Sequence, residues 1–174
     1  VACNNINDYR RIQAYRYHGK INGKFSILGF NSQMPSITAG ALLVKFKYWK
    51  KWQVKRISIA KKYNSTLRKY LKVPKVYKNE HIFHKYVLFW KKRDDLAEYL
   101  EKKNISTRIH YAQPICCYNT FGKRSCNTNN CKKTKAFVAS KNVLSLPIHP
   151  FLTNKEVSYI CKNLKIYFKR FFKY

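Results

Sequence analysis

Polar side chains at the ends of predicted elements are the residues of this sequence best placed to contact a ligand. Asn31 stands two positions after Gly29 and shortly before a long amphipathic stretch. His110 and Tyr111 end a predicted strand. The backbone holds side chains at such positions while solvent can still reach them. A local role stays open for each of them, because Asn often bonds its own backbone in turns and strand-end residues are often satisfied by neighbours.

Cysteine spacing is the second chemical feature of the sequence. Cys126 and Cys131 are separated by four residues, and Cys116 and Cys117 come nine to ten positions before Cys126. Structural zinc sites usually pair their ligands at a C-x₂₋₄-C spacing, and only one such pair is present. The sequence shows no secretory signal, so reduced thiols in a cytoplasmic protein are the default. We therefore expect neither disulfides nor a metal site.

The charge of the chain is extreme, with a formal net value of +30. A polyanion partner such as nucleic acid is one explanation, and codon bias is the other, because Lys, Asn, Tyr, Ile and Phe have A/T-rich codons. Basic residues run through nearly every segment, whereas four of the seven acidic residues fall within 94–101. A dedicated binding surface would concentrate its charge in one stripe or tail. Codon bias is therefore favoured, with nonspecific polyanion binding left open.

The composition predicts a globular chain of 174 residues. A chain of this length can bury roughly 70% of its unfolded surface as one domain. The hydrophobic content of 45%, with 16% aromatic residues, argues against wholesale disorder. No run of about 18 apolar residues is present, so we expect no membrane span and no membrane partner.

The elements before residue 72 must position Asn31. A helix ends at His18 and Gly19, and residues 20–30 form a loop with a short extended piece. Ser32 then caps one long helix, with room for a kink, that ends near Leu71 before a proline. The apolar face of this helix repeats at steps of three, four and seven and comprises Ile37, Ala41, Val44, Tyr48, Trp52, Ile59, Tyr63, Leu67 and Tyr70.

The elements after residue 72 alternate between strands and helices. Strands are predicted at 84–90 and 107–111, with a helix from Asp94 between them. The sequence predicts a loop at residues 119–130, a helix at 132–142 and an extended piece at 143–146. Thr153 and Glu156 have the spacing of a capping box that opens the last helix. The alternation predicts a small mixed α/β layer.

Several short motifs follow one another along the chain: Tyr17-His18-Gly19, Gly29-Phe30-Asn31-Ser32, His84-x-Tyr86-Val87, Arg93-Asp94, Ile109-His110-Tyr111-x-x-Pro114 and Leu144-Ser145-Leu146-Pro147. Their order resembles the C-terminal half of a DegT/DnrJ/StrS-type sugar aminotransferase. The resemblance covers residues from about 5 to 167, and single motifs within it are weak. It implies an α/β fold, the C-terminal small domain of a fold-type-I transferase that depends on pyridoxal phosphate (PLP). Residues 1–31 would then end the large domain, 32–71 would form the connecting helix, and 72–174 the small domain.

The resemblance also implies how the cofactor would be held. In this family PLP forms a Schiff base with a lysine that lies upstream of the segment matched here, so this chain is expected to carry no catalytic residue and to be inactive alone. Asn31 matches a Gly-x-Asn motif whose Asn bonds the PLP phosphate of a partner subunit. The expected partners are a lysine-bearing N-terminal half or a second copy of the chain.

The substrate implied by the resemblance is a keto nucleotide-sugar. His110 and Tyr111 match a His-Tyr pair that lines its pocket, while Gln33 stands where the family usually has a substrate-binding Arg, and Cys116 replaces a frequent His. Loss of a bidentate cation at Gln33 weakens anion binding there. Two alternatives follow from these departures: a decayed or repurposed basic fragment that binds nucleic acid, and an inactive structural fragment.

Overall fold

The computed structural model describes residues 2–75, 81–118 and 131–172. They form two compact units, Val1–Trp49 and Lys50–Tyr174, which are treated separately below. The predicted loop at 119–130, with Cys126, lies outside the described residues. Among the helices described, none combines the length and the apolar character needed to cross a membrane.

The first unit begins with α1 (Ile6–Arg16), which Asn5 caps by accepting a hydrogen bond from the Asn7 amide at 2.7 Å. The helix ends as predicted, with His18 and Gly19 both at positive φ. A small antiparallel hairpin follows, formed by β1 (Lys20–Ile21) and β2 (Lys24–Phe25). Residues 20–30 thus contain the short extended piece expected there.

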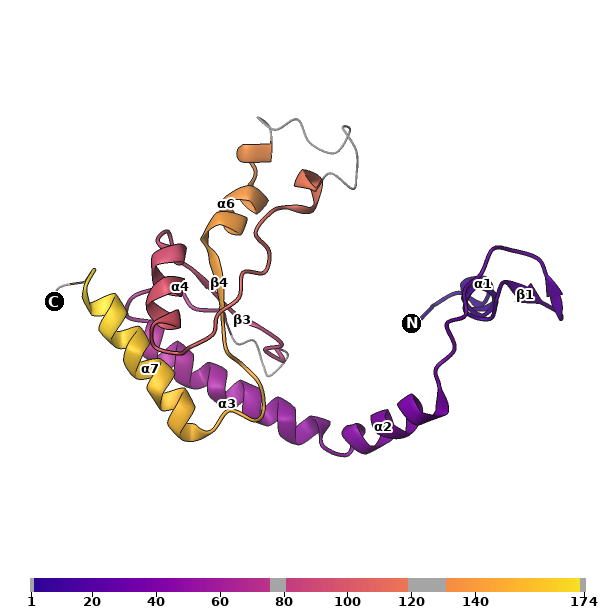
Figure 1. Cartoon of the computed structure of the whole chain (residues 1–174), viewed down its shortest axis with the longest axis horizontal. Helices are drawn as coiled ribbons and strands as arrows, with labels where there is room; N and C mark the ends of the chain where they lie inside the picture. The colour runs from indigo at the N-terminus through magenta and orange to yellow at the C-terminus, as the bar shows by residue number, and fades with distance from the viewer. Residues whose placement is uncertain (1, 76–80, 119–130, 173–174) are drawn as a thin grey trace. The chain divides into compact units, whose positions relative to one another are not determined.

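The predicted long helix is divided into α2 (Ser36–Phe46) and α3 (Trp49–Leu67) by a turn at residues 47–48 (Figure 1). The first helix starts three residues later than predicted from a cap at Ser32, because Pro35 is the cap residue and its backbone is extended. The apolar stripe divides as well. Its later members Ile59, Tyr63 and Leu67 are buried, whereas Ile37 and Val44 on α2 are exposed.

The second unit is built on β3 (Tyr86–Phe89) and β4 (Val143–Leu146), which pair antiparallel with Tyr86 opposite Leu146. The prediction of a full strand at 107–111 was wrong. Within the described residues that segment pairs with β4 at one position only, where the Arg108 amide donates to Ser145 O at 3.2 Å and the Ser145 amide donates to Arg108 O at 2.7 Å. Its apolar residues fit a strand, but its pairing with β4 does not extend beyond Arg108.

Three further helices of the described residues accompany this sheet: α4 (Arg93–Glu101), α6 (Lys135–Asn142) and α7 (Asn154–Lys169). The short 3₁₀ helix η1 (Ile115–Cys117) lies between α4 and α6 in the sequence. Residues of α3, α4, α7 and both strands share one core (Figure 1). Its largest fully buried side chains are Tyr63, Tyr86, Tyr167, Phe83, Phe168, Ile59, Leu67, Leu88, Leu96, Leu100, Leu144 and Leu164.

Buried tyrosines connect the layers of this core through their hydroxyl groups. The Tyr63 hydroxyl donates to Pro147 O at 2.8 Å, and the Tyr86 hydroxyl donates to Asn64 Oδ1 at 2.6 Å. Burial raises the pKa of both phenols, so both remain neutral donors at physiological pH. The Tyr63 bond fixes the backbone that follows β4, which is where the candidate site lies.

Candidate functional site

A pocket of about 390 Å³ lies at the edge of the second unit's sheet. Its walls come from the residues before β3, the segment bridged to β4, the end of β4 and the turn that follows. The lining residues are His84, Lys85, Ser106, Arg108, His110, Ser145, Leu146, Pro147, Ile148 and His149. Three imidazoles, an ammonium and a guanidinium therefore meet in one pocket, and none of its lining residues is acidic.

His110 is held in this pocket by the strand beside it. Its Nδ1 lies 2.9 Å from Ser145 Oγ, and Ser145 itself is 5% exposed in the middle of β4. The two backbone hydrogen bonds between Arg108 and Ser145 bring the segment to β4 two residues before the imidazole. Because one ring nitrogen is occupied by Ser145, the other ring nitrogen of His110 remains for a ligand.

Burial and nearby positive charge both favour the neutral form of His110. Burial, and then the nearby charges of Lys85, Arg108 and His84, hold the pKa of His110 below its ordinary value of 6.5. The imidazole is therefore neutral at pH 7, with one nitrogen that donates and one that accepts. The fixed positive charge of the pocket comes from Lys85 and Arg108, which favours an anionic ligand.

Tyr111 lies beside Lys85, one of the cations that line the pocket. The Lys85 Nζ lies 3.5 Å from the Tyr111 hydroxyl and 5.1 Å from the centre of its ring. This cation–π contact steadies an aromatic ring that is 64% exposed. One face of the ring can therefore stack against a ligand.

Asn31 and Gln33 belong to the first unit, and both are exposed. The main chain around Asn31 is well fixed, because Asn31 bridges Tyr17 and the Ser32 amide donates to Arg16 O at 3.0 Å. Within the described part of the chain, the Asn31 side-chain amide makes no hydrogen bond, so the local turn role considered for it is not observed. Backbone hydrogen bonds hold Asn31 in place, and its side-chain amide is accessible to a ligand.

Two glycines allow the chain to return to α1 and present Asn31. Gly19 has a φ of +76°, and a Cβ built there would lie 1.8 Å from Ile27 O. A Cβ built on Gly29 would lie 2.0 Å from the Gly19 amide nitrogen. No side chain fits between backbones this close. The glycine of the Gly-x-Asn motif is therefore needed for the loop that carries the Asn.

Of the residues predicted from the sequence, the structure places His110 in the pocket and Tyr111 beside Lys85, and it adds residues that sequence reasoning missed. Lys85, Arg108 and Ser145 were not singled out, and His149 was assigned no chemistry. One signal could have revealed Ser145, a hydroxyl between two leucines in a buried strand. No sequence signal distinguished Lys85 and Arg108 from the other basic residues of so basic a chain.

Comparison with known proteins gives this arrangement a context. The family model described as the DegT/DnrJ/EryC1/StrS aminotransferase family matches residues 1–165. The chain is 28% identical over 167 residues to a pleiotropic regulatory protein of Geobacillus stearothermophilus, covering 92% of this chain and 44% of that protein. It is 26% identical over 162 residues to the dTDP-3-amino-3,6-dideoxy-alpha-D-galactopyranose transaminase of Aneurinibacillus thermoaerophilus, covering 90% and 42%. The chain thus spans less than half the length of these relatives.

Solved structures show the same fold. A structure of DesV from S. venezuelae in complex with a ketimine intermediate superposes with a TM-score of 0.84 at 20% identity, covering 95% of this chain and 45% of that one. A putative sugar aminotransferase from Streptococcus pneumoniae in its PLP form gives 0.81 at 21% identity, covering 98% and 46%. The predicted fold class is confirmed.

Proposed function

Because this chain belongs to the DegT/DnrJ/EryC1/StrS aminotransferase family, we propose that it is the C-terminal part of a PLP-dependent aminotransferase that acts on keto nucleotide-sugars. The observation that carries the proposal is the acid-free pocket around His110, whose cations suit the diphosphate of a nucleotide-sugar. The complete enzyme would transfer an amino group from glutamate or a similar donor to the keto carbon. The predicted domain boundaries, at residues 31 and 71, remain part of this proposal.

Asn31 would contact the phosphate of the cofactor. Its amide is exposed, makes no hydrogen bond among the described residues and stands on a backbone fixed by Gly19 and Gly29, which fits a phosphate contact. When bound, PLP supplies the electron sink for the transamination chemistry. The lysine that holds it would come from the rest of the enzyme, and this chain supplies the phosphate contact.

The pocket would orient the substrate. Lys85 and Arg108 bind the diphosphate, while the neutral His110 donates one hydrogen bond from the nitrogen that Ser145 leaves available. Tyr111 stacks against an apolar face of the nucleotide or the sugar. Gln33 contributes an amide, which can hydrogen-bond but cannot form the bidentate ion pair of an Arg.

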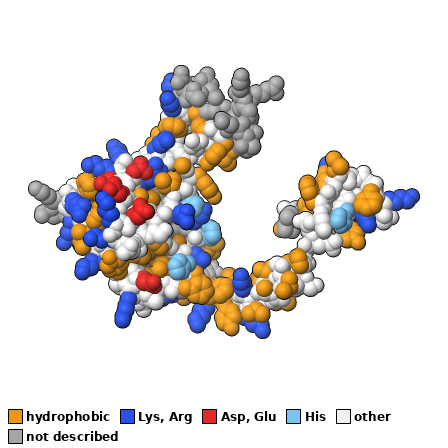
Figure 2. Space-filling model, viewed as in Figure 1, with side chains coloured by type: hydrophobic (Ala, Val, Ile, Leu, Met, Phe, Trp, Pro, Cys, Tyr) orange, Lys and Arg blue, Asp and Glu red, His pale blue; other side chains and the backbone are white. Residues whose placement is uncertain are grey.

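A partner surface is part of the same proposal. Ala14 is the buried hydrophobic residue of the first unit's described part, whereas Leu28, Phe30, Ile37 and Phe46 are exposed (Figure 2). Exposed apolar surface on this scale marks an interface. We expect the lysine-bearing N-terminal half, or a second copy of the chain, to cover it. A cytoplasmic location fits the reduced thiols but remains an expectation.

The test is kinetic and uses the complete enzyme, with this chain joined to or co-expressed with its lysine-bearing half. Lys85→Gln and Arg108→Gln should each raise KM for a keto nucleotide-sugar about tenfold or more, since each removes a charged hydrogen bond worth about 1.5–3 kcal/mol. The visible absorbance of bound PLP should not change. Lys165→Gln, an exposed position on α7, is the matched control. Equal KM values for all three variants would contradict the substrate role of the pocket.

A further inference from the structure

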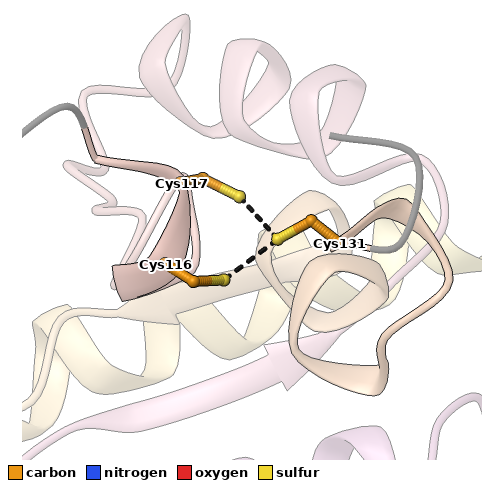
Figure 3. A group of neighbouring side chains, drawn as sticks. All are labelled: Cys116, Cys117 and Cys131. Atoms are coloured by element: carbon orange, nitrogen blue, oxygen red, sulfur yellow. Dashed lines mark hydrogen bonds between the residues drawn. The ribbon is translucent and has the colours of Figure 1, made fainter. Parts of the chain in front are cut away.

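Three cysteine sulfur atoms converge outside the set of residues that line the pocket. Cys116 and Cys117 lie on η1, and Cys131 lies shortly before α6. All three Sγ atoms lie within 4.8 Å of one another. The Cys131 Sγ is 2.9 Å from Cys116 Sγ and 2.8 Å from Cys117 Sγ. Figure 3 shows both of these sulfurs pointing toward Cys131.

This arrangement differs from that of a disulfide. A disulfide joins two sulfurs at about 2.05 Å, whereas Cys131 here lies at nearly the same, longer distance from two partners. Three sulfurs within 4.8 Å of one another can instead serve as ligands of one metal ion. A tetrahedral zinc with Zn–S bonds of about 2.3 Å places its sulfurs about 3.8 Å apart, so the two short distances need to open by only about 1 Å.

We propose that Cys116, Cys117 and Cys131 bind one Zn²⁺ ion as thiolates. Coordination replaces each S–H bond with an S–Zn bond and releases the proton to solvent, with no change in oxidation state. A tetrahedral ion takes four ligands, and the described residues supply three of them. The spacing considered in the sequence did not favour a metal; the convergence of sulfurs from two separate segments does.

The surroundings of the three cysteines fit a structural ion. Cys131 is 4% exposed, and its carbonyl accepts hydrogen bonds from the Thr134 amide at 3.0 Å and the Thr134 hydroxyl at 2.7 Å. The Cys117 amide donates to Pro114 O at 2.9 Å. The backbone on both sides is therefore held in place before any metal binds, which lowers the ordering cost of binding.

The charge of the site also fits its setting. Three thiolates and one Zn²⁺ carry a net charge of −1, and Lys132 and Lys133 directly follow Cys131 in a chain with a net charge of +30. A negatively charged centre is electrostatically favoured in such surroundings. Zinc is preferred to calcium or magnesium because thiolates are soft ligands.

The ion would fix two chain segments that lead to the pocket. Cys116 follows Tyr111 by five residues, and Cys131 precedes α6, which runs directly into β4 and Ser145. A bound ion would join the start of α6 to η1 and so restrict both segments. Metal binding itself does not depend on the proposed transferase activity.

The experiment measures metal on the full chain, purified under reducing conditions. We expect about one zinc per chain by elemental analysis, and a Co²⁺ complex with the intense thiolate charge-transfer absorption of a tetrahedral site. Cys117→Ser and Cys131→Ser should each weaken Zn²⁺ affinity about tenfold or more in a chelator competition. Cys161→Ser and Cys3→Ser are the matched controls and should bind zinc as the unmodified chain does. Cys126 is left unchanged in every variant.

Three results with the unmodified chain would overturn the inference. The first is that the chain contains no stoichiometric zinc and also fails to bind Co²⁺. The second is that it contains iron in place of zinc. The third is that a disulfide forms among the three cysteines in the reduced preparation. Cys131 is buried, so its variant can lose its fold; circular dichroism identifies that outcome. The half-buried Cys117 then provides the decisive variant. Wild-type zinc affinity in a folded Cys117→Ser chain contradicts the proposal.

Discussion

At His110, the imidazole contacts the hydroxyl of Ser145 and is influenced by the charges of Lys85 and Arg108. Burial and these charges keep the ring neutral at physiological pH, and the contact with Ser145 leaves the other ring nitrogen for a ligand. The sequence identified His110 through its place at the end of a predicted strand. It could not identify Lys85 or Arg108, because a chain with 37 basic residues offers no local contrast. Only the tertiary fold selects these two.

Protonation of His110 should respond to that charge. Lys85→Gln removes one of the positive charges that oppose protonation, so the pKa of His110 should rise toward 6.5. Histidine NMR signals followed across pH 4.5–8 measure this, with Lys165→Gln as control. Because the folded-state pKa is lowered, the unfolded state takes up the proton first, and His110 lowers stability as the pH falls below about 6.5. An unshifted His110 titration in Lys85→Gln would contradict the electrostatic account.

Among the elements, α7 shows where local sequence is sufficient. Thr153 and Glu156 form the predicted capping box: the Glu156 carboxylate accepts from the Thr153 amide at 2.7 Å, and Thr153 Oγ1 accepts from the Glu156 amide at 3.2 Å.

Farther along α7, the Tyr167 hydroxyl donates to Asp95 Oδ2 at 2.6 Å and accepts from Trp90 Nε1 at 3.2 Å. Burial raises the pKa of Tyr167 to about 12.

Other elements could not be read from sequence to the same extent. The apolar repeat continues across residues 47–48, so it gave no sign of the turn that separates α2 from α3. The segment 107–111 has a strand-like composition, yet its partner strand offers it one bridge at Ser145. A cap is decided by neighbours three residues apart, whereas strand pairing depends on residues far away in the sequence.

The capping box should make the second unit sensitive to acid. Hydrogen bonds from the Thr153 hydroxyl and amide lower the pKa of Glu156 below its usual 4.5. The stabilisation is thus present above about pH 4.5 and is lost as the pH falls through the lowered pKa. Thr153→Ala should cost about 1 kcal/mol of unfolding free energy at pH 7 and less at pH 3, measured by urea denaturation. A cost that does not change with pH would argue against the ionised cap. Ser65→Ala, on α3, is a comparison outside the cap.

At the scale of the whole chain, the net charge of +30 is distributed rather than concentrated. Lys and Arg side chains are scattered over the visible face of each unit, without one continuous stripe (Figure 2). Diffuse charge binds polyanions without selectivity, because it neutralises phosphates wherever they lie. This is the behaviour expected of a biased composition rather than of a dedicated nucleic-acid site.

Heparin chromatography distinguishes the two cases. Two triple Lys→Gln variants remove equal charge from different helices, and both should lower the eluting salt concentration by the same amount. The exposed positions are Lys50, Lys51 and Lys61 on α3, and Lys155, Lys162 and Lys165 on α7. Triple Lys→Arg variants at the same sites keep the charge and should elute unchanged. A loss confined to one helix would instead reveal a localised binding surface.

The close backbone approach of Gly19 and Gly29 limits how the turn that carries Asn31 can vary. Two of the five glycines of the chain meet where a single methyl group would collide with backbone. Even Gly→Ala at either position would therefore push the two backbone segments apart and move Asn31.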